Sequence, residues 1–406
     1  MGRNVIVGQS GGPTAVINSS LAGVFEGAKN EGISKIYGMV NGIEGLLKGS
    51  YIDMDDYLKE ENDIELLKRT PGAFLGSCRY KLPDMDKGKN VYEKLFGILE
   101  KLEIGYFIYI GGNDSMDTIL KLSTYADMIN SDIKFMGVPK TVDNDLAETD
   151  HTPGFGSAAK FVAAELKEII RDSSVYDMES VTIVEIMGRN AGWLTASSIL
   201  AKGKDCNGPD MIYLPECAFD KEKFLEKINE LRKVQKTIVV AVSESLHDKD
   251  GNFLCEEGAE ISAADAFGHK ILSGTATYLA DLVSHRLGIK ARGIVFNTPQ
   301  RCGTHIASKC DITEAYTAGA EAVRAALEGH TGEMVIFRRV SDEPYKVMTE
   351  TYDIHKVANE EKTVPEKWII NDGTYISDEF IKYCRPLIMG EIEPFMEDGL
   401  PRHMVR

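Results

Sequence analysis

Short runs of apolar, mostly β-branched residues alternate along this chain with amphipathic stretches. The first run, from Asn4 to Gly8, precedes a stretch in which Val16, Leu21 and Val24 recur at helical spacing. This alternation predicts parallel strands whose helical connections cover both faces of a sheet. We expect further strands at residues 35–40, 106–110, 133–138, 181–188, 211–214, 237–242 and 293–296, and further helices near 90–102, 157–172, 224–235, 263–287 and 311–328.

The pattern changes after Gly332, where two further β-rich runs, MVIFRR and YKVMTETY, precede a closing helix expected near 378–387. We interpret this part as a mixed C-terminal layer. The chain has 406 residues, 43% of them apolar, which is enough for more than one core. We therefore predict an α/β protein of two doubly wound domains with the active site in the cleft between them.

Charge and cysteine usage exclude several classes of partner. Asp and Glu total 63 against 46 Lys and Arg, a net charge of −17, which repels nucleic acid and anionic membranes. No apolar run approaches the ~20 residues of a membrane span. The seven cysteines are scattered without metal-ligand spacing. We expect a cytoplasmic protein with reduced thiols, no nucleic-acid or membrane partner, and a local cluster of basic residues for any anionic substrate.

Three Gly-rich turns follow expected strands directly, at the edge where an α/β sheet binds ligands. The first is GQSGGPTAVIN, in which Gly11 and Gly12 would let an anion approach the backbone and the following helix N-terminus. A tight structural turn would look the same. The second turn, GGNDS from Gly111 to Ser115, and the third, PKTVDND from Pro139 to Asp145, should converge on one place.

The polar residues of the second and third turns suit phosphoryl transfer. That chemistry needs oxygen ligands for a metal, a cation on the transferring group and a carboxylate that accepts the proton of the attacking hydroxyl. The alternative is that Asp143 and Asp145 only cap the next segment and turn the chain. The residues concerned are Asn113, Asp114, Lys140, Thr141, Asp143 and Asp145.

These turns, together with DHTPGFGSA, MGRNAGW from Met187 to Trp193 and PQRCG ending at Gly303, resemble the phosphofructokinase family in motif and order over most of the chain. Family members that use ATP resemble GGDGS and PGTIDND, whereas users of pyrophosphate resemble GGDDS and PKTIDND. This chain has Asp114 and Lys140 where the ATP pattern has glycines. The resemblance therefore implies reversible phosphorylation of fructose 6-phosphate by pyrophosphate, with Mg²⁺ as cofactor.

The resemblance also implies roles for individual residues. Asp143 is the expected base for the sugar 1-hydroxyl, and Asp145 orients that hydroxyl or the metal. Asn113 stands where the common pattern has Asp, so the metal would be held there by an amide oxygen or through water. The expected catalytic residues are Asp143, Lys140 and Asp114; the sugar phosphate is expected at Thr141, Val142, Asp145, Met187, Gly188, Arg189, Glu244, Arg292 and Arg301; the diphosphate at Gly11, Gly12, Arg79 and Gly112; and the metal at Asn113.

Two departures concern the phosphate of the sugar. Ser180 stands where the family usually has a further phosphate-binding Arg, and Lys356 or Lys382 could substitute for it. In the family one or more of these phosphate-binding arginines reach across from a neighbouring subunit, which implies a homo-oligomer, a dimer or a tetramer, although Arg292 could equally serve its own site. The resemblance suggests a larger, donor-binding domain of residues 1–152 plus 300–345, and a smaller, sugar-binding domain of 153–299 plus 346–406.

Three alternatives stay open at this point. An ATP-dependent enzyme of the same fold is the nearest, and Asp114 and Lys140 argue against it. A catalytically silent phosphate-sensing subunit would have no need of the base Asp143. Other kinases with a similar Gly-rich turn, acting on NAD or lipid, lack the Met-Gly-Arg and Gln-Arg elements found here. Arg79 could also be a solvated surface arginine.

Overall fold

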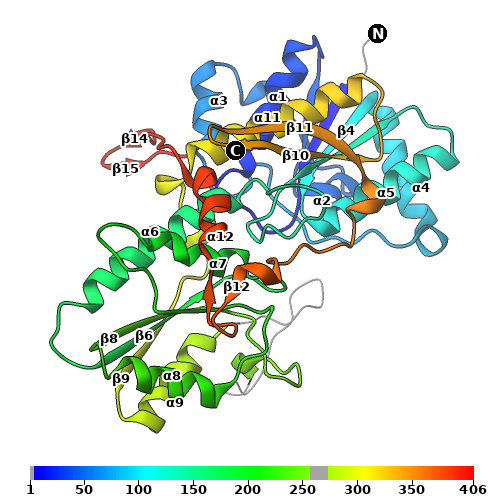
Figure 1. Cartoon of the computed structure of the whole chain (residues 1–406). Helices are drawn as coiled ribbons and strands as arrows, with labels where there is room; N and C mark the ends of the chain where they lie inside the picture. The colour runs from blue at the N-terminus through cyan, green and yellow to red at the C-terminus, as the bar shows by residue number, and fades with distance from the viewer. Residues whose placement is uncertain (1–3, 257–272) are drawn as a thin grey trace.

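Two β-sheets, each covered by its own helices, organise the chain (Figure 1). The computed structural model describes residues 4–256 and 273–406. Open α/β sheets covered by helices in this way bind their ligands at the carboxyl ends of the parallel strands. The two sheets therefore decide where the candidate site lies.

The larger sheet has seven strands in the order β11-β10-β5-β4-β1-β2-β3, parallel except for the two edge strands. Both faces of its central strands are buried, because Val5 and Val7 pack into one core and Ile6 into the other. This explains the continuous apolar runs in the sequence. The strands are β1 (Asn4–Gln9), β2 (Ile36–Met39), β3 (Tyr51–Asp53), β4 (Ile104–Gly111), β5 (Lys134–Pro139), β10 (Glu333–Asp342) and β11 (Tyr345–Asp353).

Helices cover the two faces of this sheet separately. The core that contains Val5 also contains apolar residues of α1, α3 and α11, and the core that contains Ile6 contains those of α2, α4 and α5. This is the doubly wound arrangement that the sequence predicts. The helices are α1 (Ile17–Asn30), α2 (Gly42–Leu47), α3 (Glu61–Lys68), α4 (Met85–Lys101), α5 (Asn113–Met128) and α11 (Lys309–Leu327).

The smaller sheet has four strands, all parallel, in the order β7-β8-β6-β9. Along β6, Ile183 packs with α8 and α9 whereas Val184 packs with α6, α7 and α12, so this sheet too is covered on both faces. The elements are β6 (Ser180–Ile186), β7 (Met211–Tyr213), β8 (Thr237–Ser243), β9 (Lys290–Val295), α6 (Phe155–Ser173), α7 (Trp193–Ser197), α8 (Lys221–Leu231), α9 (Thr275–Leu287) and α12 (Asp378–Cys384).

A buried carboxylate joins the two units. Asp311, in the first turn of α11, accepts hydrogen bonds from the backbone N–H groups of Gly154 (2.9 Å) and Ser157 (2.8 Å) at the start of α6. It thereby satisfies donors that the first turn of a helix leaves without partners. The long helix α6 of the smaller unit thus begins at a hydrogen-bonded contact with α11 of the larger unit.

The C-terminal part is shared between the two units. Strand β11 pairs antiparallel with β10 inside the larger sheet, whereas α12 packs in the core of the smaller unit. The boundary expected after residue 345 would separate β11 from its partner, so the larger unit has to extend to residue 353; the rest of the domain division stays a prediction. Two short hairpins complete this part, β12 (Ile369–Ile370) with β13 (Tyr375–Ile376) and β14 (Met396–Glu397) with β15 (Leu400–Pro401).

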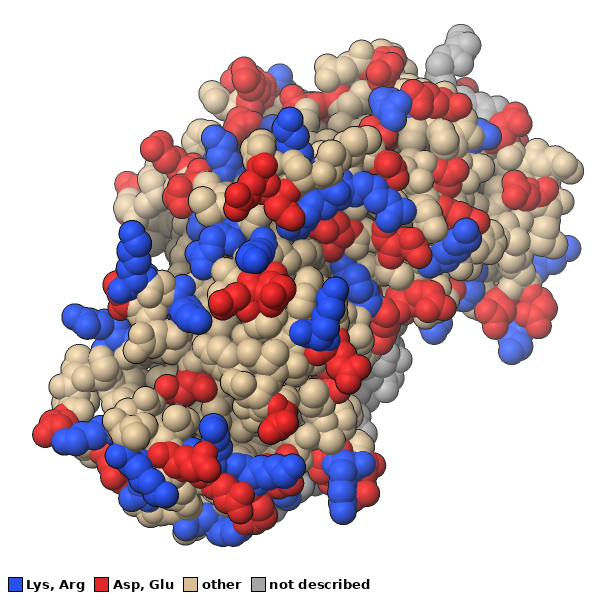
Figure 2. Space-filling model, in the orientation of Figure 1, with Lys and Arg blue, Asp and Glu red and all other residues tan. Residues whose placement is uncertain are grey.

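The fold class expected from the sequence is confirmed, with local differences at element ends. The helix expected over 263–287 begins at Thr275 in the described part, and its expected residues 263–272 lie outside the described residues. The closing helix expected to reach 387 ends at Cys384 and continues as a 3-10 turn. Figure 2 shows acidic and basic side chains interspersed over the face drawn. Among the described helices, none is long and apolar enough to cross a membrane.

Candidate active site

A cavity of about 520 Å³ lies where the carboxyl ends of both sheets meet. The three Gly-rich turns line it from the larger sheet, and the segments after β6 and β8 line it from the smaller sheet. The lining residues are Ser10, Gly11, Gly12, Pro13, Arg79, Lys81, Gly112, Asn113, Asp114, Ser115, Lys140, Thr141, Val142, Asp143, Asp145, Met187, Arg189, Asn190, Glu244, Arg301, Asn359 and Glu361.

The first turn holds a lysine from the third. Gly11 has φ = 77°, in the left-handed region, and a Cβ atom there would stand 3.3 Å from the Nζ atom of Lys140. That ammonium donates a hydrogen bond to the carbonyl oxygen of Gly12 (2.8 Å). The residues of this turn that line the cavity end at Pro13, whereas α1 begins only at Ile17. The turn and Lys140 therefore face the cavity, and the N-terminus of α1 does not.

The second turn passes directly into α5, which begins at Asn113. Gly112 to Ser115 line the cavity, so the N-terminus of this 16-residue helix faces it, an arrangement that favours phosphate groups. The side chain of Asn113 donates from Nδ2 to the carbonyl oxygen of Glu360 (3.2 Å). Its Oδ1 atom is buried and has no hydrogen-bond partner among the described residues. Asp114 is exposed to solvent at the cavity.

The third turn is fixed to the second. The backbone N–H of Lys140 donates to the carbonyl oxygen of Gly111 (2.9 Å), which ties the ends of β5 and β4 together. The backbone N–H of Asp143 donates to Thr141 Oγ1 (3.1 Å), and Asn144 follows with φ = 55°. These constraints place the Asp143 and Asp145 side chains in the same cavity as Lys140, as the sequence predicts.

Burial moves the pKa values of these groups toward neutrality. Burial lowers the pKa of Lys140 to about 8, against the opposing influence of the Asp143 carboxylate. Burial raises the pKa of Asp143, and the neighbouring Lys140 and Arg189 act in the opposite direction. Burial and the Asp143 charge together raise the pKa of Asp145 to about 7. A buried carboxyl with a raised pKa next to a cation is the kind of group that can accept a proton near neutral pH.

The segment after β6 supports the opposite wall. Gly188 has φ = 149°, and its carbonyl oxygen accepts hydrogen bonds from the hydroxyls of Ser243 (2.9 Å) and Ser245 (2.7 Å). Its backbone N–H donates to Glu244 (3.3 Å), whose pKa burial raises to about 7. Gly188 is absent from the cavity lining but holds Glu244 there. Met187 and Arg189, on either side of it, line the cavity as expected.

The arginines expected at the sugar phosphate lie in different places. Arg301, on α10 (Pro299–Cys302), lines the cavity, and one of its terminal nitrogens would stand 3.2 Å from a Cβ atom on Gly12. Its Nε atom is buried and has no hydrogen-bond partner among the described residues. Arg292 is exposed on β9, an edge strand of the smaller sheet, and does not line the cavity. Arg79 does line it.

Neither of the lysines suggested as substitutes for a phosphate-binding Arg lines this cavity. Lys356 and Lys382 are both exposed, and Lys356 lies over the ring of Tyr352 (5.5 Å). Ser180, where the family has the Arg, pairs with Lys290 at the start of β9.

His151, which follows the third turn in the sequence, is buried and held by two carboxylates. Its two ring nitrogens lie 2.8 Å from Asp150 Oδ2 and 2.7 Å from Glu314 Oε2, and its ring stacks on Phe337. Although burial alone would lower it, the Glu314 and Asp150 carboxylates raise the pKa of His151 to about 9. His151 thus links Asp150 to Glu314 on α11.

Several lining residues escaped sequence reasoning. Lys81 lies two positions after Arg79, and Asn190 directly follows Arg189. Their closeness to these expected site residues is the signal from which both could have been found. Asn359 and Glu361 gave no signal, because they follow no expected strand and carry no motif. They reach the cavity only through the tertiary fold.

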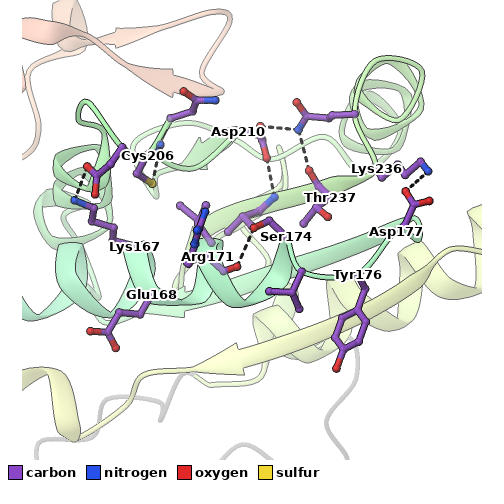
Figure 3. Close-up of a pocket in the computed structure, with 17 residues that line it drawn as sticks. Lys167, Glu168, Arg171, Ser174, Tyr176, Asp177, Cys206, Asp210, Lys236 and Thr237 are labelled. Carbon is purple, nitrogen blue, oxygen red and sulfur yellow. Dashed lines mark hydrogen bonds and ion pairs between the residues drawn. The ribbon is translucent and has the colours of Figure 1, made fainter.

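A second cavity, of about 1030 Å³, lies at the opposite, amino-terminal end of β8 and next to the last turns of α6 (Figure 3). Its lysines are paired with carboxylates: Lys167 with Asp205 (2.8 Å) and Lys236 with Asp177. Asp210 accepts hydrogen bonds from Gln235 and from the backbone of Val239. No motif from the sequence falls there, so the smaller cavity is the candidate active site.

The residues present suit a bound divalent cation. Mg²⁺ is usually held by one or two protein oxygens together with substrate phosphates and water, so no closed protein cage is expected. Asn113 Oδ1, which lacks a partner, supplies such an oxygen at the cavity. In the described part of the chain, no group of three or more His, Cys, Asp or Glu side chains is placed to hold a metal on its own.

Comparisons with known proteins agree with this geometry. A pyrophosphate–fructose 6-phosphate 1-phosphotransferase from Halomonas elongata is 40% identical over 404 residues, which cover 98% of this chain and 95% of that protein. The crystal structure of a pyrophosphate-dependent phosphofructokinase from Nitrosospira multiformis superposes with a TM-score of 0.89 at 39% identity, covering 99% of this chain and 95% of the other. A sulfofructose kinase from Alkalicoccus urumqiensis is 32% identical over 373 residues, 91% of this chain and 93% of that protein. The family model Phosphofructokinase matches residues 4–326, and the chain belongs to the phosphofructokinase family.

Proposed function

We propose that this chain transfers a phosphoryl group reversibly from inorganic pyrophosphate to the 1-hydroxyl of fructose 6-phosphate, giving fructose 1,6-bisphosphate and phosphate. The observation that carries the proposal is that Asp143 and Lys140, of one turn, line the same cavity as Asp114 at the start of α5. Asp143 supplies a base for the reaction, and Lys140 supplies a cation. Lys140 and Asp114 also occupy the two positions that distinguish users of pyrophosphate from users of ATP.

On the acceptor side, Asp143 accepts the proton of the sugar 1-hydroxyl as its oxygen attacks phosphorus. The raised pKa of Asp143 suits a base that works near neutral pH. Asp145 and Thr141 orient the hydroxyl, and Glu244 accepts hydrogen bonds from sugar hydroxyls. Met187 and Arg189 form the wall against which the sugar lies.

On the donor side, cationic groups meet the charge of the diphosphate. Lys140 neutralises negative charge that develops as the bond between phosphorus and the bridging oxygen breaks, which is where electrostatic help lowers the barrier most. Arg79 and the N-terminus of α5 bind the phosphate that leaves. When the protein holds pyrophosphate in line with the sugar hydroxyl, the phosphoryl group passes directly between the two substrates. The protein itself then needs to form no covalent bond.

Mg²⁺ fits this reaction as the cofactor. Asn113 would hold it through Oδ1, next to the diphosphate. When bound, the ion supplies positive charge to the phosphate oxygens.

Donor choice follows from the exposed carboxylate of Asp114. An ATP molecule carries a further phosphate and a nucleoside on the side of the donor that leaves, and Asp114 would repel that added charge. Two unit charges 4 Å apart interact by about 1 kcal/mol in water and about 4 kcal/mol near a protein surface. Because Asp114 is exposed, the discrimination should lie in the lower part of this range, about tenfold or more.

We further propose that the protein works in the cytoplasm as a homo-oligomer, a dimer or a tetramer. Arg292 supports this, because it is exposed on an edge strand and outside its own cavity, where it could serve the sugar phosphate of a neighbouring copy. Light scattering coupled to gel filtration would measure the number of copies.

A donor and acceptor panel tests the proposal. The kcat/KM of the purified protein is measured with pyrophosphate and with ATP, each with fructose 6-phosphate, and sulfofructose is included because one relative is named for it. We expect pyrophosphate to be preferred, and the reverse reaction to run from fructose 1,6-bisphosphate and phosphate. An Asp143→Asn preparation made in the same way detects contaminating activity. Preference for ATP, or no transfer with either donor, would overturn the proposal.

A further inference from the structure

A short segment of the C-terminal part, residues 359–362, crosses from one half of the candidate site to the other; we call it the bridging segment. The carbonyl oxygen of Glu360 accepts a hydrogen bond from Asn113 at the start of α5 (3.2 Å). The carboxylate of Glu361 accepts one from Asn190 after β6 (2.6 Å). The segment therefore contacts the donor side, built on the larger sheet, and the sugar side, built on the smaller sheet.

Lys362, the last residue of the bridging segment, is bonded to the loop that carries the base. Its backbone N–H donates to the carbonyl oxygen of Asp145 (2.8 Å). Its ammonium donates to the carbonyl oxygens of Thr149 and Asp150 (2.9 Å each) and lies 3.5 Å from Asn144 Oδ1. An ammonium has three N–H donors, and here three acceptors of one loop surround it.

The same residue is anchored in the smaller unit. The carbonyl oxygen of Lys362 accepts a hydrogen bond from the indole N–H of Trp193 (2.8 Å), and its ammonium stands 5.1 Å from the centre of that ring. Trp193 opens α7 and is buried in the core of the smaller unit. Lys362 thus holds a loop of the larger unit against a rigid element of the smaller one.

The loop needs such support because of Asn144, which lies between the two aspartates. Asn144 has φ = 55° and a fully buried side chain. Its Oδ1 accepts a hydrogen bond from the backbone of Thr152 (3.0 Å), and its Nδ2 donates to Tyr383 (2.9 Å). Without the ammonium, the carbonyl oxygens of Thr149 and Asp150 lose a donor, and the loop can relax away from this conformation.

We propose that Lys362 is a positioning residue, which holds the loop 143–152 so that the Asp143 carboxylate meets the acceptor hydroxyl. The inference rests on the proposed function. Lys362 is not among the residues that line the cavity, so it acts through the loop and not through the substrates. A displacement of about 1 Å at reacting groups can lower a rate by about a hundredfold, whereas substrate binding by other residues would change little.

The experiment compares Lys362→Met with the native protein and with Lys367→Met, a matched change at an exposed lysine five positions further on. We expect Lys362→Met to lower kcat about 10- to 100-fold while the KM values for pyrophosphate and fructose 6-phosphate change less than about threefold. Lys367→Met should keep the native values. Circular dichroism at the assay temperature confirms that each variant is folded.

A folded Lys362→Met protein with kcat within twofold of native, or with raised KM and unchanged kcat, would overturn the inference. If Lys362→Met does not fold, Lys362→Gln, whose shorter, uncharged side chain lacks the ammonium, is judged by the same two quantities. The native protein is assayed first with pyrophosphate: absence of turnover there contradicts the proposed function, whereas native turnover with an unaffected Lys362 variant contradicts the positioning role alone.

Discussion

The donor side and the acceptor side of the cavity are built differently. The three Gly-rich turns, which carry the proposed donor site and the proposed base, follow neighbouring strands of one sheet and are bonded to one another, with Ser10 N–H donating to Ile110 (2.9 Å) and Lys140 donating both to Gly111 and to Gly12. The acceptor side combines segments after two strands of the other sheet with Arg301 from α10, while Arg292 stays outside. In our proposal a single chain therefore presents the whole donor site, whereas the acceptor site depends on how the two units, and two copies of the chain, come together.

Removal of the proposed base, Asp143, should have the largest effect. Asp143 lies on a turn of the larger sheet but acts on the hydroxyl of the acceptor. We expect Asp143→Asn to lower kcat by about 10²- to 10⁴-fold, because a positioned general base typically contributes that much. Neither KM should change much, since Asn keeps the shape of the side chain. Steady-state kinetics with both substrates measure the effect, and Asp398→Asn, an exposed change far along the chain, is the control. Turnover within a few-fold of native would remove Asp143 from the mechanism.

The two arginines test whether the acceptor side extends beyond one chain. Arg301→Ala should raise the KM for fructose 6-phosphate about 10- to 100-fold and that for pyrophosphate far less, because hydrogen bonds to a charged group contribute about 1.5–3 kcal/mol. Arg292→Ala should likewise raise the KM for fructose 6-phosphate if Arg292 binds the sugar phosphate at the site of a neighbouring copy. Initial rates with each substrate varied in turn measure both constants.

Mixing supplies the control for Arg292. Subunits with Arg292→Ala are mixed with subunits with Asp143→Asn. The mixture should regain activity if Arg292 acts on the site of a neighbouring subunit, and should stay inactive if each site uses its own Arg292. A larger effect of Arg301→Ala on pyrophosphate would instead assign Arg301 to the donor side, where it lies beside Gly12.

Donor choice should depend on the donor side alone. We expect Asp114→Gly to shift the ratio of kcat/KM for ATP over pyrophosphate by about tenfold toward ATP, because it removes a repelling charge. The KM for fructose 6-phosphate should stay unchanged. Asp127→Gly, at the other end of α5, is the matched control for the loss of helix propensity. An unaltered donor ratio would show that Asp114 does not select the donor.

The smallest effect concerns pH. Asp145 and Glu244, with pKa values raised to about 7 by burial, lose their charge as the pH falls through 7, and Lys140, whose pKa burial lowers to about 8, loses its charge as the pH rises through 8. The kcat/KM should therefore be bell-shaped between pH 6 and 9.5, falling a few-fold on either side.

Lys140→Arg should move the alkaline limb to higher pH, because a guanidinium stays protonated. The difference between the two profiles isolates Lys140, since Lys362, whose pKa burial also lowers to about 8, is present in both proteins. Identical alkaline limbs would assign the limb to another group.

The sequence by itself determined the strands and the residues at their carboxyl ends. Runs such as Tyr106 to Ile110 are apolar throughout because both faces of a central strand are buried, and that is visible locally. A polar turn placed after such a strand, as at Lys140, has few other places to go in an α/β sheet. This is why nearly the whole expected site lines one cavity.

Only the tertiary structure decided the rest. That Arg301 reaches Gly12, that Arg292 stays outside the cavity and that β11 joins the larger sheet all depend on how the two units are packed. The bridging segment is the clearest case: Lys362 lies more than 200 positions after Asp145, in a stretch without periodicity or motif, yet it is hydrogen-bonded to that residue. Contacts between residues so distant leave no local pattern, because they are fixed by the free energy of packing the whole chain and not by the preferences of any one segment.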